Sequence, residues 1–114
     1  MVRKVLFVCS QNRLRSPTAE QVFSARRDLE VASAGTNNDA ETPLDDELVE
    51  WADIIFVMER AHRNKLLKKF RKSVRARVIC LNIPDNYEYM EPSLVELLER
   101  KVSLHLPKTA FASE

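Results

Sequence analysis

The chain has 114 residues, of which 45% are hydrophobic and 31% are charged, and its formal net charge is +1. This composition excludes disordered and collagen-like proteins, and the length fits one domain over residues 1–114. No apolar run approaches the ~20 residues of a membrane-spanning helix, and the first residues lead directly into a short apolar run. We therefore expect a cytoplasmic protein without a membrane-bound segment.

Four short apolar runs are interpreted as buried strands, and segments with helical periodicity separate them. The runs do not alternate between apolar and polar residues, which is typical of strands covered on both faces. The predicted strands are 4–8, 31–33, 54–58 and 78–81, and the predicted helices are 17–27, 44–52, 61–70 and 92–106.

This alternation predicts an α/β fold with an open, doubly wound sheet. We expect four parallel strands in the order 2-1-3-4 with helices on both faces. In that order the crossovers leave the first strand in opposite directions, so a ligand-binding crevice is expected at its carboxyl end. Cys9 directly follows this strand.

Segment 9–17, Cys-Ser-Gln-Asn-Arg-Leu-Arg-Ser-Pro, places a thiol and a guanidinium six positions apart at a strand-to-helix junction. Such a loop directs backbone N–H groups and a helix N-terminus to one point, where an oxyanion can bind and a thiolate is favoured. Arg15 can hold two phosphoryl oxygens, and Ser16 can form a hydrogen bond with the sulfur of Cys9. Asn12 tolerates the left-handed backbone that a tight loop without glycine needs.

The remaining thiol and imidazole groups give no metal-binding spacing, so we expect neither a metal nor another cofactor. Cys80 lies in an apolar run and is interpreted as a small buried thiol. The sequence leaves a disulfide between Cys9 and Cys80 open. His62, at the start of the third predicted helix, is interpreted as a capping or surface residue.

The pattern Cys-x-x-Asn-x-x-Arg-Ser-Pro after the first strand resembles the phosphate-binding loop of the low-molecular-weight protein tyrosine phosphatase family. Segments 31–36, 52–58 and 85–87 resemble further parts of that family in the same order. The resemblance implies a cysteine-dependent phosphatase domain that forms a cysteinyl-phosphate intermediate without a metal ion.

Carried over by residue, the resemblance implies that Cys9 is the nucleophile and that Arg15 holds the phosphoryl group. It nominates Asp85 as the general acid and Ser33 as a partner of Asn12 behind the loop. The other implied substrate-binding residues are those of the loop and one aromatic residue after the acid: Ser10, Gln11, Asn12, Arg13, Leu14, Ser16 and Tyr87.

The chemistry independently needs an acid, because an alkoxide or phenoxide leaves phosphorus slowly unless it is protonated. Asp85 follows the last predicted strand and can overhang the crevice, although it can also be read as a turn aspartate. Glu59, Glu88 and Glu91 are the alternative acids.

The chain departs from the family pattern around the expected substrate pocket. Segment 36–53 is shorter than in typical members and lacks the aromatic wall that they carry there, which leaves Tyr87 as the one expected wall. Leu14 stands where many members have a second, redox-protecting cysteine. Asn86 follows Asp85 where proline is usual.

The charges are unevenly distributed along the chain. Residues 39–59 contain eight acids and no Lys or Arg, whereas residues 60–77 contain nine Lys or Arg and no acid. The simpler interpretation of the basic segment is a solvated helix face that offsets the acidic segment. The alternative is a docking surface for an anionic partner or nucleic acid.

These observations predict phosphomonoester hydrolysis, with phosphotyrosine in proteins as the main substrate class and small phosphomonoesters as further substrates. One alternative is a phosphate-dependent binding module for a phosphorylated or nucleic-acid partner. The other is an arsenate reductase, for which Cys80 alone could supply the additional thiol.

Overall fold

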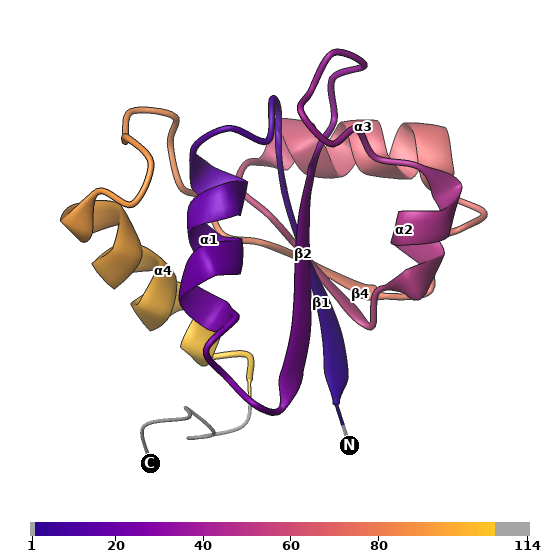
Figure 1. The fold of residues 1–114 in the computed structure, drawn as a ribbon. Coiled ribbons are helices and arrows are strands. Elements are labelled where there is room, and N and C mark those ends of the chain that lie inside the picture. The colour runs from indigo at the N-terminus through magenta and orange to yellow at the C-terminus, as the bar shows by residue number, and fades with distance from the viewer. Residues whose placement is uncertain (1, 107–114) are drawn as a thin grey trace.

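Four parallel strands form the centre of the computed structural model, which describes residues 2–106 (Figure 1). The predicted domain extends over 1–114, and residues 1 and 107–114 lie outside the described part. The elements in chain order are β1 (Arg3–Cys9), α1 (Arg15–Phe23), β2 (Leu29–Gly35), α2 (Asp46–Trp51), β3 (Ile54–Val57), α3 (Arg60–Phe70), β4 (Arg77–Cys80) and α4 (Pro92–Ser103).

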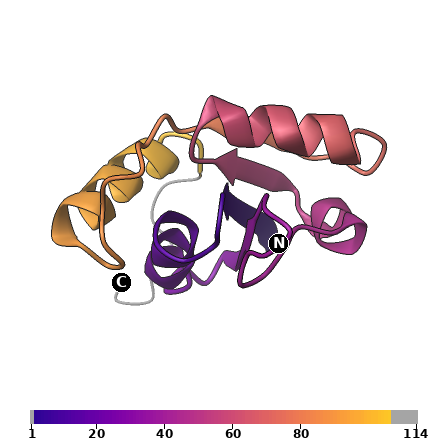
Figure 2. The same cartoon turned by 90° about the horizontal axis from the view of Figure 1, so that it is seen from above.

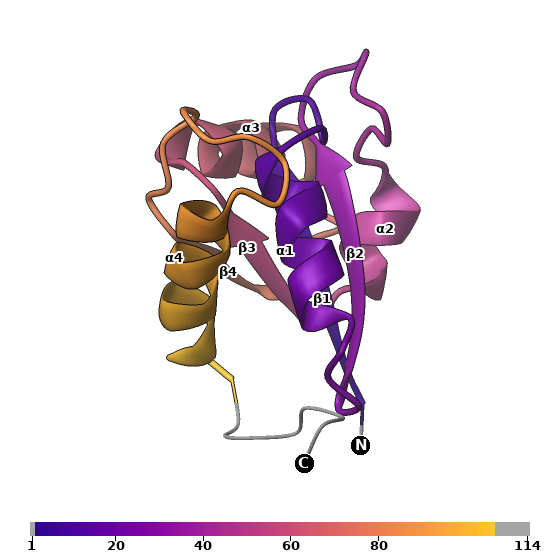
Figure 3. The same cartoon turned by 60° about the vertical axis from the view of Figure 1, so that its left-hand side comes forward.

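The strand order is β2-β1-β3-β4 and every pairing is parallel, which confirms the predicted fold class. β1 pairs with β2 along its whole length, from Arg3 opposite Leu29 to Cys9 opposite Gly35. Because parallel strands end at the same edge, the segments that follow all four strands gather there, at the top of Figure 3. The end of β1 lies in the middle of this edge.

The sheet separates two apolar clusters, since successive residues of a strand point to opposite faces. Val5 and Phe7 pack with residues of α1 and α4, whereas Leu6 and Val8 pack with residues of α2 and α3. Figures 1 and 2 show these two pairs of helices on opposite sides of the sheet. All four β1 side chains are completely buried, and each contributes roughly 1.5–3 kcal/mol through the hydrophobic effect.

Local hydrogen bonds shift several helix ends from the predicted positions. α1 begins at Arg15 rather than at Pro17, because the first N–H groups of a helix need no intrahelical partner and proline is tolerated there. The helix ends at Phe23 rather than at residue 27. In the turn that follows, the Arg26 side chain donates two hydrogen bonds, of 2.9 and 2.7 Å, to the carboxylate of Asp28.

The other two displaced helices are shorter than predicted. α2 begins after Asp45, whose carboxylate accepts a 2.7 Å hydrogen bond from the N–H of Leu48 and thereby caps the helix. α4 ends at Ser103 instead of residue 106. None of the helices within residues 2–106 has the length and apolar character needed to cross a membrane.

Cys80 is only half-buried, so the prediction of a buried thiol was wrong. Its strand, β4, lies at the edge of the sheet, and its Sγ is 3.4 Å from Oδ1 of Asn82. Strand β3 separates β4 from β1, which places Cys80 and Cys9 about two strand spacings, or ~10 Å, apart. This exceeds the ~7 Å Cα separation that a disulfide tolerates, and both thiols are free.

Gly35 allows three segments to meet at the end of β2. The N–H of Thr36 donates to the carbonyl of Cys9 at 2.9 Å, and the N–H of Asn37 donates to the carbonyl of Ser10 at 3.0 Å. A Cβ atom at position 35 would lie 2.5 Å from the Cβ of Ala40 and 2.5 Å from the carbonyl oxygen of Ser10. Only glycine therefore fits this contact between β2 and the loop after β1.

We expect Gly35→Ala to lower the free energy of unfolding by about 1–3 kcal/mol, because the new methyl group must displace the backbone of the loop. Urea denaturation measures this loss. Adding Ala40→Gly should recover only part of it, since the clash with the carbonyl of Ser10 remains. An unchanged denaturation midpoint in Gly35→Ala would contradict the expected close approach.

Candidate active site

The loop between β1 and α1 surrounds a cavity of about 200 Å³ at the carboxyl edge of the sheet. The cavity brings together most of the side chains that the sequence predicts around a phosphoryl group. Its lining residues are Cys9, Ser10, Gln11, Arg13, Leu14, Arg15 and Asp85. Asn12, Ser16 and Ser33 lie behind this lining, where all three are buried.

Asn12 holds the loop in its tight conformation. Its φ of 59° lies in the left-handed region, as predicted for a loop without glycine. Its side-chain amide donates to Oγ of Ser16 at 3.0 Å and to Oγ of Ser33 at 2.9 Å. Ser33 in turn donates to the carboxylate of Glu20 at 2.5 Å, a contact that the sequence analysis did not predict.

The sulfur of Cys9 receives hydrogen bonds from two directions. The N–H of Asn12 donates to Sγ at 3.2 Å, and Oγ of Ser16 lies 2.9 Å from it. Because Ser16 already accepts a hydrogen bond from the Asn12 amide, its hydroxyl hydrogen is available for the sulfur. Two donors are thus aimed at one sulfur, beside the N-terminus of α1.

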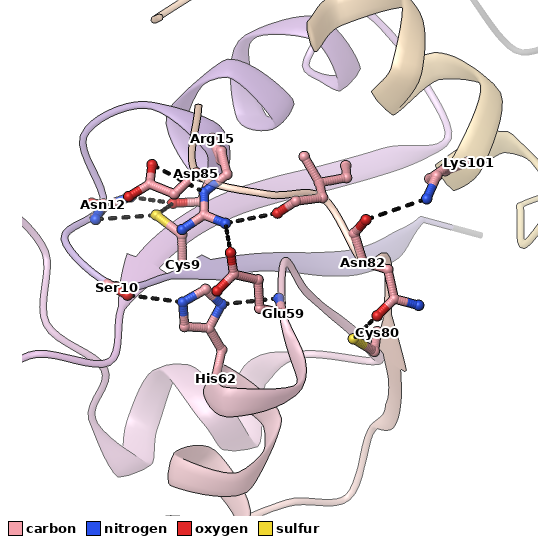
Figure 4. Close-up of polar contacts among 12 residues, drawn as sticks. Cys9, Ser10, Asn12, Arg15, Glu59, His62, Cys80, Asn82, Asp85 and Lys101 are labelled. Carbon is pink, nitrogen blue, oxygen red and sulfur yellow. Dashed lines mark hydrogen bonds and ion pairs between the residues drawn. The ribbon is translucent and has the colours of Figure 1, made fainter. Parts of the chain in front are cut away.

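The guanidinium of Arg15 is held by groups on two other strand ends (Figure 4). Its Nη1 donates to Oε2 of Glu59 at 2.8 Å and to the carbonyl of Ile83 at 2.7 Å. Asp85 lies on another side, with Oδ1 3.7 Å from Nε. The charged group is thus buried, paired and oriented before any ligand binds.

Sequence reasoning missed the role of Glu59, which it considered only as an alternative acid. The available signal was its position directly after β3, at the same sheet edge as the loop. The prediction for His62 was half right, because this residue caps α3 together with Glu59 but is buried rather than on the surface.

His62 orients the hydroxyl of Ser10. Its Nδ1 accepts a 3.1 Å hydrogen bond from the N–H of Glu59, which leaves the ring hydrogen on Nε2. Nε2 lies 2.8 Å from Oγ of Ser10 and therefore donates to it, so that the hydroxyl hydrogen of Ser10 is free to point to the cavity. Burial, and then the charge of Arg15, lower the pKa of His62 from 6.5 to about 4, which keeps the ring neutral.

The carboxylates considered as acids occupy different places. Asp85 lines the cavity and its side chain is 64% exposed, whereas Glu59 is bound to Arg15. Glu91 accepts hydrogen bonds from the N–H of Glu88 and from the hydroxyl of Ser93 in the first turn of α4, and it does not line the cavity. Asp85 is the carboxylate that faces both the loop and solvent.

Tyr87 does not line the cavity. Its half-buried ring packs against the apolar cluster beneath α1 and α4. Within residues 2–106, no three His, Cys, Asp or Glu side chains form a group that could hold a metal ion. The cavity presents a thiol, a guanidinium, a carboxylate and the backbone N–H groups of the loop.

Comparisons with known proteins agree with this arrangement. The family model for low molecular weight phosphotyrosine protein phosphatase matches residues 4–51, which carry β1, the loop, α1 and β2. No sequence among the curated proteins matches the chain significantly.

Solved structures of this family share the fold over nearly the whole chain. A low molecular weight protein tyrosine phosphatase from Streptococcus pyogenes, SP-PTP, superposes with a TM-score of 0.76 at 17% identity, over 94% of this chain and 95% of the other. Vibrio vulnificus Wzb, solved in complex with benzylphosphonate, superposes with a TM-score of 0.74 at 23% identity. The match covers 92% of this chain and 97% of Wzb. The YwlE arginine phosphatase from Geobacillus stearothermophilus superposes with a TM-score of 0.72 at 20% identity. The match covers 90% of this chain and 93% of YwlE.

Fold and loop together define the class of the protein as a cysteine-dependent phosphatase. The predicted resemblance to the low-molecular-weight protein tyrosine phosphatases is confirmed: the family model matches residues 4–51, and the chain shares its fold with solved structures of phosphatases.

The buried, neutral His62 should make the stability of the protein depend on pH. An unfolded chain protonates this imidazole near pH 6.5, whereas the folded protein resists protonation until about pH 4. Stability present above pH 6.5 should therefore be lost as the pH falls toward 5. Urea denaturation at pH 7.5, 6.5 and 5.5 measures the loss.

In His62→Gln we expect a lower stability at pH 7.5 but a smaller decrease over the same pH range, because no imidazole titrates at this site. His105→Gln is the control, since it leaves His62 in place and should retain that site's contribution to the decrease. Equal slopes in wild type and His62→Gln would contradict the assignment.

Proposed function

We propose that the protein hydrolyses phosphomonoesters, with phosphotyrosine in proteins as the main substrate class, through a cysteinyl-phosphate intermediate and without a metal ion. One observation carries this proposal: the sulfur of Cys9 accepts two hydrogen bonds at the base of a cavity that Arg15 and Asp85 also line. A nucleophile, an anion-binding group and an acid therefore face one small space.

In this mechanism the phosphoryl group binds over the loop. Its non-bridging oxygens accept hydrogen bonds from the loop N–H groups and from the free N–H groups of the Arg15 guanidinium. The Ser10 hydroxyl, oriented by His62, adds a donor at the rim. The preorganised donors stabilise the negative charge that the phosphorane-like transition state carries.

The first chemical step transfers the phosphoryl group to sulfur. The Cys9 thiolate attacks phosphorus as the bond between phosphorus and the leaving oxygen breaks, and the Asp85 carboxyl group donates its proton to that oxygen. In the second step the Asp85 carboxylate takes a proton from water, whose oxygen attacks the same phosphorus. The P–S bond then breaks, and inorganic phosphate and the thiolate are released.

Phosphotyrosine rather than phosphoarginine is proposed as the main substrate because the family model that matches the loop is described for phosphotyrosine. Some of the structural neighbours are described as tyrosine phosphatases and another as an arginine phosphatase. The small cavity, of about 200 Å³, is also compatible with small phosphomonoesters as substrates.

Cys9→Ser should lower turnover of p-nitrophenyl phosphate by at least about a thousandfold, because the serine hydroxyl is a far weaker nucleophile at neutral pH. Steady-state assays in the presence of a chelator measure the loss, and the chelator itself should have no effect on the wild type. Cys80→Ser removes the other thiol and should retain wild-type turnover. Turnover that persists in Cys9→Ser would overturn the proposed mechanism, and tight phosphopeptide binding without wild-type turnover would favour a binding module.

Asp85→Asn should slow phenyl phosphate, whose leaving group is poor, far more than p-nitrophenyl phosphate, whose leaving group needs little protonation. We expect roughly a hundredfold loss of kcat for phenyl phosphate, in the range usual for a removed general acid. Glu88→Gln is the matched control from the same loop and should affect both substrates little. Equal slowing of both substrates by Asp85→Asn would remove this residue from the role of acid.

A further inference from the structure

A groove with a volume of about 740 Å³ flanks the phosphate-binding cavity on the side of α3. One wall is the segment 36–39 that follows β2, and the other is α3. The α3 wall contributes three exposed lysines, Lys65, Lys68 and Lys69. We refer to this feature as the lysine groove.

The positive charge of the lysine groove is largely uncompensated. Lys65 donates to the side-chain oxygen of Asn37 at 3.2 Å, and Lys69 lies 3.4 Å from that of Asn38. Both partners are neutral amides, which position the ammonium groups but do not neutralise them. Asp39 is the one carboxylate among the described lining residues, against three lysines.

The lysine groove lies next to the phosphate-binding loop, because Ser10 contacts both the segment after β2 and the first turn of α3. The carbonyl of Ser10 accepts a 3.0 Å hydrogen bond from the N–H of Asn37, and its hydroxyl is 2.8 Å from Nε2 of His62 in the first turn of α3. Ser10 also lines the phosphate-binding cavity. A ligand chain that leaves the cavity past Ser10 therefore enters the lysine groove.

The floor of the groove is apolar. Leu44, Leu66 and Phe70 form it, and all three side chains are buried. From His62 to Lys69 the helix rises by about 10 Å, which matches about three residues of an extended peptide. The groove thus combines the length, the apolar base and the charge that suit a short acidic peptide segment.

We propose that the lysine groove binds acidic side chains of the substrate protein, about two to four positions from the phosphorylated residue. The proposal rests on the phosphatase function proposed above and adds the substrate class to it. A peptide fits the lining better than a nucleic acid does. Phe70, the aromatic residue of the floor, is buried and offers little surface for base stacking.

The test compares two phosphotyrosine peptides that differ only near the phosphotyrosine. One carries glutamates about two to four positions away on both sides, and the other carries glutamines there. We expect the wild-type kcat/KM to be about tenfold higher for the glutamate peptide, as two or three partly exposed ion pairs would give. The preference should decrease with added salt.

The variant with Lys65→Gln, Lys68→Gln and Lys69→Gln should bring this ratio close to one. The matched control carries Lys72→Gln, Arg75→Gln and Arg77→Gln, which removes the same charge at exposed positions outside the groove, and it should keep the tenfold ratio. If the wild type has the same kcat/KM for both peptides, the proposal is overturned while the phosphatase function remains intact. The proposal is also overturned if both triple variants lose the preference equally.

Absent turnover of p-nitrophenyl phosphate and of both peptides would instead refute the phosphatase function. The groove is then tested by fluorescence anisotropy with the same two peptides and the unmodified chain. A tenfold tighter binding of the glutamate peptide that the groove variant loses supports the peptide site. Equal binding of the two peptides overturns it, as does a groove variant that loses affinity for a single-stranded RNA oligonucleotide but shows no change with peptides.

Discussion

The geometry of the site depends on the side chain of Asn12, whose two amide hydrogens both form hydrogen bonds inside the protein. One goes to Ser16 and the other to Ser33 on β2. These two bonds hold a left-handed backbone that asparagine adopts at some cost, and they leave the hydroxyl of Ser16 directed at the sulfur of Cys9. A loop held from behind in this way keeps its front face free for a ligand.

The side of the loop that faces the cavity is held by the charged guanidinium of Arg15. Arg15 is buried between Glu59 and the carbonyl of Ile83, which come from the ends of two further strands. Because a buried cation is costly without partners, folding itself requires this guanidinium to be oriented. A dianion bound at the proposed site would therefore meet groups whose orientation the fold has already set, which reduces the conformational entropy lost on binding.

Features that follow from a continuous stretch of sequence were predictable. The unalternating apolar runs predicted a parallel sheet, and their alternation with helical segments predicted its strand order. The segment from Cys9 to Ser16 predicted the loop, including the left-handed Asn12. Contacts between distant segments were not. The pair formed by Arg15 and Glu59 spans 44 positions, and no local pattern distinguishes this glutamate from the other carboxylates at the sheet edge.

Burial was hardest to predict where a local pattern gave the wrong environment. The apolar run around Cys80 suggested a buried thiol, yet its strand lies at the edge of the sheet, as the predicted strand order implies, and the thiol there is only half-buried. His62 begins a strongly basic helix and suggested a surface residue, yet its imidazole fills the space between two strand ends. In both cases the position of the whole element in the fold, rather than its own residues, determined the exposure.

The segment after β2 is bound to the loop by main-chain atoms alone. The N–H groups of Thr36, Asn37 and Glu41 donate to the carbonyls of Cys9, Ser10 and Gln11, and none of these bonds depends on the identity of a side chain. Substitutions at exposed positions of this segment can therefore change which molecules are recognised while leaving the reactive centre in place. Apart from Gly35, the junction between this segment and the loop uses contacts that almost any amino acid can make, so the recognition surface and the proposed reactive centre could diverge separately.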